Sequence, residues 1–76
     1  MNNERRKLLQ KQIDIIEQAK QDIEILKDEE QKYADDMPEN LQSSDKHDKA
    51  EQAVSSLEEA INNIDEAIQQ MNGTIQ

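Results

Sequence analysis

The chain contains no cysteine, no tryptophan and no phenylalanine, and its 76 residues include a single glycine, a single proline and a single tyrosine. The absence of cysteine excludes a disulfide framework and a zinc site built from thiolates. One glycine and one proline are too few for the turns of a multi-stranded sheet or for a glycine-rich phosphate loop. The sequence therefore favours an all-α protein with one domain, residues 1–76.

Long apolar runs are also missing. No run approaches the roughly 18 residues of a membrane span, and the start MNNERRKLLQ lacks the apolar core of a signal peptide. Eighteen acidic side chains against nine basic ones give a formal net charge of −9, which disfavours DNA, RNA and anionic membranes as partners. We expect a soluble cytoplasmic protein that binds neither nucleic acid nor membranes directly.

The second half of the chain has the apolar spacing of an amphipathic helix. Three consecutive heptads, AVSSLEE, AINNIDE and AIQQMNG, place large apolar residues alternately three and four positions apart, with an alanine before each pair. The apolar residues are Ala53, Val54, Leu57, Ala60, Ile61, Ile64, Ala67, Ile68 and Met71. The pattern predicts a helix over 45–72, ended by Gly73, with 73–76 as a frayed tail.

The first half predicts another helix over 3–35, because no proline or glycine interrupts it. Its apolar stripe is less regular. The residues at three- and four-residue spacing are Leu9, Ile16, Ala19, Ile23, Leu26 and Tyr33. Leu8 and Ile15 widen this stripe, whereas Ile13 and Ile25 lie off it. Apolar residues on additional faces predict packing against more than one neighbour.

Residues 36–44 are predicted to form a connector that reverses the chain. Pro38 cannot stand in a helix interior and disfavours helical angles at the residue before it. One of Ser43, Ser44 and Asp45, all favourable N-cap residues, should begin the second helix. The predicted fold is an antiparallel helical hairpin.

An isolated hairpin of this size buries too little apolar surface to offset the ordering of its chain. Burying one large apolar side chain gains about 1.5–3 kcal/mol, against roughly 1.5 kcal/mol of ordering for every residue. We therefore expect a homo-oligomeric helical bundle, a dimer or larger, in which copies cover the remaining apolar surface. The expected interface comprises the nine apolar residues of the second helix together with Ile16, Ile23 and Leu26.

The sequence contains no motif that indicates catalysis. A Ser-His-Asp arrangement can be drawn from Ser43 or Ser44 with His47, but serines at this place are typical of helix caps. The acidic connector around His47 matches neither the EF-hand nor the His-Glu-x-x-His spacing. We expect no enzyme activity, no metal ion and no cofactor.

Two features suggest a site for a small ligand. Tyr33, one helical turn before the connector, is either a plug at the end of the core or a platform on which a planar ring stacks, with Leu41 nearby. The basic start of the first helix either balances Asp65 and Glu66 at the end of the second helix or contacts a phosphate. The candidate ligand residues are Tyr33, Met37, Ser43, Ser44, Lys46, His47, Arg5 and Arg6.

The stretch YADDMPENLQSSDKHDKAEQAVSSLEEAINNIDEAI resembles short acidic helical-hairpin proteins of phages, prophages and mobile elements. The shared features are a Met-Pro-Glu-Asn-Leu-Gln-x-Ser connector, here 37–44, and a following helix with repeated acidic heptads. The resemblance carries no established activity. It implies a viral, non-enzymatic oligomer that acts against host defence by sequestering a nucleotide-like ligand at subunit junctions.

Two other functions fit the same sequence. The carboxylate arrays on both helices could imitate DNA phosphates and occupy a basic groove on a host defence or regulatory protein. A structural or scaffold role within a virion is the third hypothesis.

Overall fold

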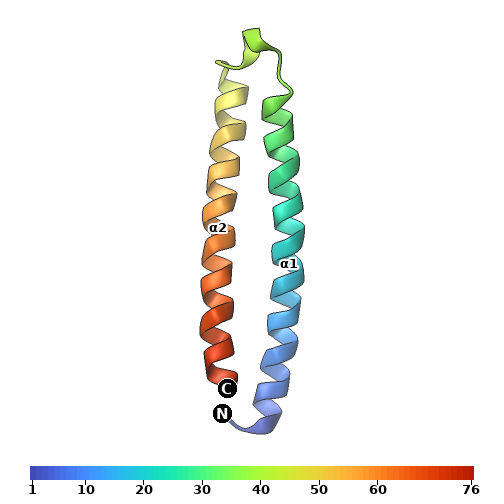
Figure 1. Ribbon diagram of the computed structural model, residues 1–76, viewed down its shortest axis with the longest axis vertical. Helices are drawn as coiled ribbons and strands as arrows, with labels where there is room; N and C mark the ends of the chain where they lie inside the picture. The colour runs from blue at the N-terminus through green and yellow to red at the C-terminus, as the bar shows by residue number, and fades with distance from the viewer.

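The computed structural model describes all residues 1–76 and consists of two long helices packed side by side (Figure 1). Helix α1 spans Asn3–Asp35, a short 3₁₀ helix η1 spans Glu39–Leu41, and helix α2 spans Asp45–Ile75. The chain contains no strand, and its Cα trace measures 59 × 15 × 13 Å. The two termini lie at one end of the rod and the connector at the other (Figure 1). The predicted all-α hairpin is confirmed.

Local sequence sets the ends of α1. At its start the side-chain oxygen of Asn2 accepts a hydrogen bond from the backbone N–H of Arg5 at 2.8 Å and thereby caps the first turn. At its end Asp36 is the C-cap, and two residues later Pro38 adopts an extended conformation with ψ 149°. The connector then makes one 3₁₀ turn, in which Leu41 N–H donates to the carbonyl of Pro38 at 2.8 Å. The helix ends before the proline, as the sequence predicts.

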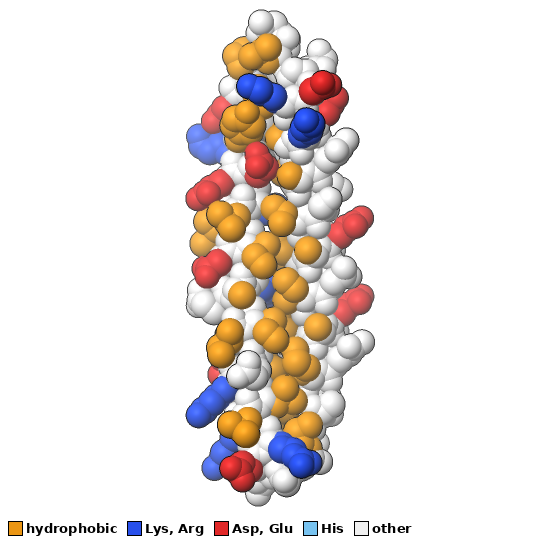
Figure 2. Space-filling view, turned by 180° about the vertical axis from the view of Figure 1, so that it is seen from behind, with side chains coloured by type: hydrophobic (Ala, Val, Ile, Leu, Met, Phe, Trp, Pro, Cys, Tyr) orange, Lys and Arg blue, Asp and Glu red, His pale blue; other side chains and the backbone are white.

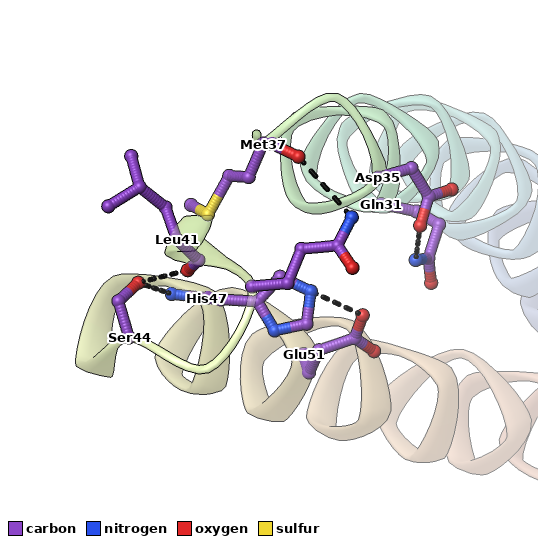
Figure 3. A network of polar contacts seen from close by, with 8 residues as sticks. Gln31, Asp35, Met37, Leu41, Ser44, His47 and Glu51 are labelled. Carbon is purple, nitrogen blue, oxygen red and sulfur yellow. Dashed lines mark hydrogen bonds and ion pairs between the residues drawn. The ribbon is translucent and has the colours of Figure 1, made fainter. Parts of the chain in front are cut away.

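Of the three candidate caps, Ser44 begins α2. Its backbone is extended (φ −77°, ψ 162°), and its hydroxyl oxygen accepts a hydrogen bond from the backbone N–H of His47 at 3.3 Å. The same hydroxyl donates to the carbonyl of Leu41 at 2.6 Å, so one side chain joins the 3₁₀ turn to the helix (Figure 3).

Replacing Ser44 by alanine should lower the free energy of unfolding by about 1 kcal/mol, because both hydrogen bonds disappear. The neighbouring Ser43→Ala is the matched control, since Ser43 is exposed and its side chain makes no hydrogen bond. Urea denaturation of the two variants measures the difference. Equal stabilities would contradict the assignment of Ser44 as the cap.

The end of α2 differs from the prediction. The helix continues through Gly73 to Ile75, and no residue of the chain has a positive φ, so Gly73 does not adopt the left-handed conformation of a helix stop. The reason is that Ile75 lies four residues after Met71 and extends the three- and four-residue apolar spacing by one step. It is partly buried, and Thr74 supports the last turn by donating its hydroxyl to the carbonyl of Met71 at 2.7 Å.

A helical Gly73 predicts that Gly73→Ala raises the free energy of unfolding by about 0.5–1 kcal/mol, because alanine loses less backbone entropy in a helix. No atom lies within 4 Å of the position that the added Cβ would occupy. Thermal denaturation checks the prediction. A loss of stability would instead indicate a left-handed glycine and restore the predicted stop.

The core is a thin seam between the helices. Its buried members are Ile13, Ala34, Ala50, Val54, Ile61 and Ile68. On α2 the seam contains one of the two predicted large apolar positions of each heptad, Val54, Ile61 and Ile68, whereas the other position, Leu57, Ile64 and Met71, is only partly buried. On α1 the prediction was partly wrong: Ile13, expected off the stripe, is 2 % exposed, whereas Leu26, expected within it, is 58 % exposed. Lys20 and Lys27 occupy the intervening seam positions, where their alkyl chains are partly buried and their amines reach acids of α2.

Neither helix contains an apolar stretch long enough to cross a lipid bilayer.

Candidate functional site

The two long sides of the hairpin differ in chemistry. On one side, which we call the polar side, lysines of α1 reach across to carboxylates of α2. Lys20 Nζ lies 2.6 Å from Asp65 Oδ1, and Lys27 Nζ lies 3.9 Å from Glu58 Oε1. A shallow polar hollow of about 250 Å³ lies on this side, lined by Lys27, Glu58 and their neighbours. The polar side is therefore satisfied within the chain.

The hydrogen bond from Lys20 to Asp65 holds the pKa of the lysine above its ordinary value of 10.5, although partial desolvation opposes the shift. Because the pKa is raised in the folded chain, the pair stabilises the hairpin below pH 10.5, and this contribution is lost as the pH rises through the folded-state pKa. Both side chains contact solvent, so the pair fixes the register of the helices more than it stabilises them.

This pairing corrects the expected role of the basic cluster. The cluster lies at the end of the rod where α2 ends (Figure 1), but Asp65 pairs with Lys20, and neither Arg5 nor Arg6 forms an ion pair. The reason is that Asp65 lies nearly three helical turns before Ile75, level with the middle of α1. Arg6 donates instead to Asn3 Oδ1 at 3.0 Å, and its Nε is buried without a partner. The two arginines at this end therefore remain without an ion pair in the single chain.

The opposite long side carries a band of apolar side chains over both helices, and we call it the apolar side (Figure 2). Its α1 members lie about a quarter of a turn round the helix from the seam, and its α2 members lie on the same flank of the seam. Four of them, Leu8, Ile15, Leu26 and Tyr33, are each more than half exposed. The apolar side comprises Leu8, Ile15, Ala19, Leu26, Tyr33, Ala53, Leu57, Ala60, Ile64, Ala67 and Met71.

The additional apolar residues of α1 are divided between the seam and the surface of the hairpin. Ile13 lies in the seam, and Leu8 and Ile15 lie on the apolar side. Only Ile25, 57 % exposed, projects from the outer surface of α1. Of the expected interface residues, Val54, Ile61 and Ile68 are buried in the hairpin's own core. The rest lie on the apolar side or are partly buried beside the seam, as Ile16 and Ile23 are.

The connector and the adjoining helix ends, which together we call the tip, form a second candidate site. A hollow of about 610 Å³ opens there beside Tyr33, which is 51 % exposed. It is lined by Tyr33, Asp36, Met37, Pro38, Leu41, Ser44, Asp45 and Lys46. A smaller hollow of about 290 Å³ shares Tyr33 and Lys46 and is completed by Glu30, Lys49 and Ala50. The Tyr33 side chain therefore borders both hollows.

A network of hydrogen bonds holds the tip in shape (Figure 3). Gln42 Nε2 donates to the carbonyl of Met37 at 3.3 Å, and Gln31 Nε2 donates to Asp35 Oδ1 at 2.9 Å. His47 turns its Nε2 toward Glu51 Oε1 at 3.5 Å, one turn further along α2. The Gln42 bond closes the connector on itself, whereas the other two contacts each lie within one helix. The connector is joined to α1 by the Met37 N–H donating to the Ala34 carbonyl at 3.3 Å and to α2 by Ser44.

The predicted ligand residues divide into three groups. Tyr33, Met37, Ser44 and Lys46 come together around the tip hollow. Ser43 and His47 lie close by but do not line it, because Ser43 faces solvent and the ring of His47 is partly buried beside Glu51. Arg5 and Arg6 belong to the start of α1, which lies at the opposite end of the rod (Figure 1).

The sequence analysis missed Asp36, Pro38 and Asp45 as lining residues. Pro38 was treated there as a helix breaker and Asp45 as a cap, and neither role indicates a binding surface. They join the site because the 3₁₀ turn brings the ends of both helices around one hollow.

The tip has no arrangement for nucleophilic attack. The Ser44 hydroxyl is engaged by the Leu41 carbonyl and the His47 backbone, and the His47 ring is directed at Glu51 instead of a serine. Nowhere do three His, Asp or Glu side chains converge as ligands of a metal ion. The site can present a planar ring, apolar carbon, the hydroxyls of Tyr33 and Ser44, one amine and the carboxylates of Asp36 and Asp45 to a bound molecule.

Comparison with protein families, with curated proteins and with solved structures gives no match to this chain.

Proposed function

We propose that the chain is a non-enzymatic binding protein that pairs through its apolar side and takes up a small, planar, nucleotide-like ligand at the tip. The observation that carries the proposal is that the exposed apolar side and the tip hollow meet at Tyr33. This residue ends the exposed apolar side and also lines the tip hollow. Pairing and ligand uptake would therefore meet at one residue.

The exposed apolar side supports self-association. Only six of 76 residues are buried, whereas Leu8, Ile15, Leu26 and Tyr33 project from one surface of α1. Each of these side chains gains about 1.5–3 kcal/mol when fully buried. Because the polar side is satisfied within the chain, a single self-complementary surface remains, and such a surface gives a closed dimer instead of an open fibre.

The tip hollow supports a planar ligand. The half-exposed ring of Tyr33 offers a stacking surface, Met37, Pro38 and Leu41 supply apolar contacts, and Ser44 and Lys46 supply polar ones. Within one chain, however, the only cation at this hollow faces two carboxylates, Asp36 and Asp45. A phosphate-bearing ligand would need a further cation from a second copy, which favours a site at the junction between subunits.

Sequestration of such a ligand would serve counter-defence, the role that the resemblance of the connector implies. Imitation of DNA phosphates is less well supported, because Lys20 and Lys27 pair with Asp65 and Glu58 and interrupt the carboxylate array. A virion scaffold would need a surface that allows open assembly, and the single apolar side does not offer one.

A thermal-shift assay with nucleoside monophosphates, diphosphates and cyclic dinucleotides tests the proposal. A ligand at a hundredfold excess over its Kd should stabilise the protein by about 2.7 kcal/mol. Tyr33→Ala should abolish the shift and Tyr33→Phe should keep it, because phenylalanine retains the stacking ring. Sedimentation of each variant checks that the dimer persists. No shift across the panel in a dimeric protein would contradict ligand uptake.

A further inference from the structure

The charges of α1 are divided between its two ends. Residues 3–11 carry four basic side chains and one acidic one, whereas residues 12–36 carry nine acidic side chains and three lysines. Those three lysines, Lys20, Lys27 and Lys32, already lie within 4 Å of carboxylates of the same chain. Arg5, in contrast, has no ion pair and stands at the basic end next to the apolar side. Helix α1 is therefore a rod with a free positive end and an acidic end.

Two apolar sides can be stacked with two-fold symmetry in two ways. In the first, the two tips lie at the same end, and α1 of each copy covers α2 of the other. This brings the two acidic tips together at one end and the two basic starts of α1 together at the other. Helix α2 has no charged side chain after Glu66, so it offers no carboxylate side chain to balance the basic starts. In the second, the tips lie at opposite ends, and α1 covers α1 of the other copy with reversed direction. Each basic start then faces an acidic end, which is the favourable arrangement.

We infer that two copies pack through their apolar sides with the tips at opposite ends, so that Arg5 of the second copy completes the site beside Tyr33. The inference rests on the proposed self-association. The middle of α1 is Ala19, where a small side chain allows close approach. A two-fold axis through this residue brings position 5 of one copy level with position 33 of the other. Arg5 would then reach the smaller hollow, where Glu30 offers a carboxylate and Tyr33 a ring face for the guanidinium, beside the amines of Lys46 and Lys49.

The size of the apolar side suits this partner. The apolar side follows α1 from Leu8 to Tyr33, about 38 Å at 1.5 Å per residue, and the rod is 15 Å across. Each copy therefore presents about 570 Å², so pairing buries about 1,100 Å² in total, which exceeds the roughly 1,000 Å² that a specific interface needs. The arrangement also adds a second cation beside the larger hollow, where Lys46 is the only one from the same chain. A guanidinium beside Tyr33 and Lys46 would offset the two carboxylates of the larger hollow and bind a phosphate through its planar fork.

Cysteine pairing distinguishes the two arrangements cleanly, because the chain has no cysteine of its own. Arg5→Cys and Glu30→Cys chains are prepared separately, unfolded together, refolded as a mixture and oxidised. Positions 5 and 30 are about 37 Å apart along one helix, so they meet only between copies with opposite tips. The expected result is a mixed disulfide dimer, seen by mass spectrometry, with little disulfide from either variant alone. A dimeric mixture that gives no mixed disulfide would overturn the inference.

A charge swap at the same pair is a second readout that needs no oxidation. Arg5→Glu and Glu30→Arg should each weaken the dimer by about tenfold in Kd, and the double variant should recover most of the loss. Lys7→Glu is the matched control, since Lys7 changes the charge equally but projects away from the apolar side. A double variant whose dimer is no tighter than those of the single variants would also contradict the inference. A monomeric wild type would contradict the proposed function itself, whereas a dimer without a mixed disulfide contradicts only its orientation.

Discussion

Replacing Ile15 by glutamate should convert the protein from a dimer into a monomer, whereas Ile25→Glu should leave the dimer intact. Both isoleucines belong to α1 and are almost equally exposed in the single chain, at 60 % and 57 %. Only Ile15 lies on the apolar side. The first substitution removes two isoleucines from the dimer interface, each 60 % exposed in the single chain, and the lost burial amounts to about 2–4 kcal/mol. This corresponds to roughly a 30- to 1,000-fold increase in Kd, before the further cost of burying two carboxylates.

Sedimentation velocity of the two variants at equal concentration measures this effect. The comparison is informative because the single chain gives no reason for any difference between the two positions. An equal response of both variants, whether both remain paired or both dissociate, would show that the apolar side is not the interface. Circular dichroism is a second readout, since Ile15→Glu should lose helical signal as the dimer dissociates, whereas Ile25→Glu should keep it.

The second large effect is expected from Ile13→Ala, which should lower the free energy of unfolding by about 2–5 kcal/mol. Ile13 is the best-buried large side chain of α1, at 2 % exposure, and its truncation opens a cavity in a seam that has few other buried members. A chain of this length has a total stability of only about 4–11 kcal/mol. The variant should therefore lose a large share of its helical signal at moderate urea concentrations.

Ile25→Ala is the matched control and should change the stability by less than about 0.5 kcal/mol, since it removes an exposed side chain. Urea denaturation of both variants must be made at one protein concentration, because pairing contributes to the measured stability. If Ile13→Ala costs no more than Ile25→Ala, the seam observed in the structure is wrong, and α1 presents another face to α2.

The parts of the fold that sequence could predict are those set by neighbouring residues. Pro38 ends α1 through its own backbone geometry, and Ser44 caps α2 by accepting a hydrogen bond from the backbone N–H three residues later. The seam of α2 was also predictable, because its large apolar residues follow a single three- and four-residue spacing. No knowledge of the partner helix is needed for any of these features.

The seam of α1 could not be predicted, because two apolar stripes overlap on this helix. Residues such as Leu8, Ile15 and Leu26 form one stripe, and residues such as Ile13 and Ile16 form the other. Which of the two stripes packs in the seam depends on α2, because Asp65 and Glu58 of that helix pair with lysines of the second stripe. A prediction from the spacing of apolar residues does not include these lysines, so it treats the two stripes as one.

The candidate site shows the same division between local and distant information. Tyr33, Met37, Ser44 and Lys46 are close in sequence around one turn, so their grouping at the tip followed from the predicted hairpin. Arg5 and Arg6 were predicted as ligand residues because they are cationic, but the start of α1 lies at the end of the rod away from the tip (Figure 1). Their place in the site depends on a second copy, which no spacing within one chain encodes.

The most direct test of self-association is sedimentation velocity of the unmodified protein over a concentration series from micromolar to submillimolar. The account predicts a species of twice 8.8 kDa that dissociates on dilution, with loss of helical signal as the apolar side becomes exposed to water. A fully helical species of 8.8 kDa at every concentration would contradict it, because the hairpin would then be stable with its apolar side uncovered.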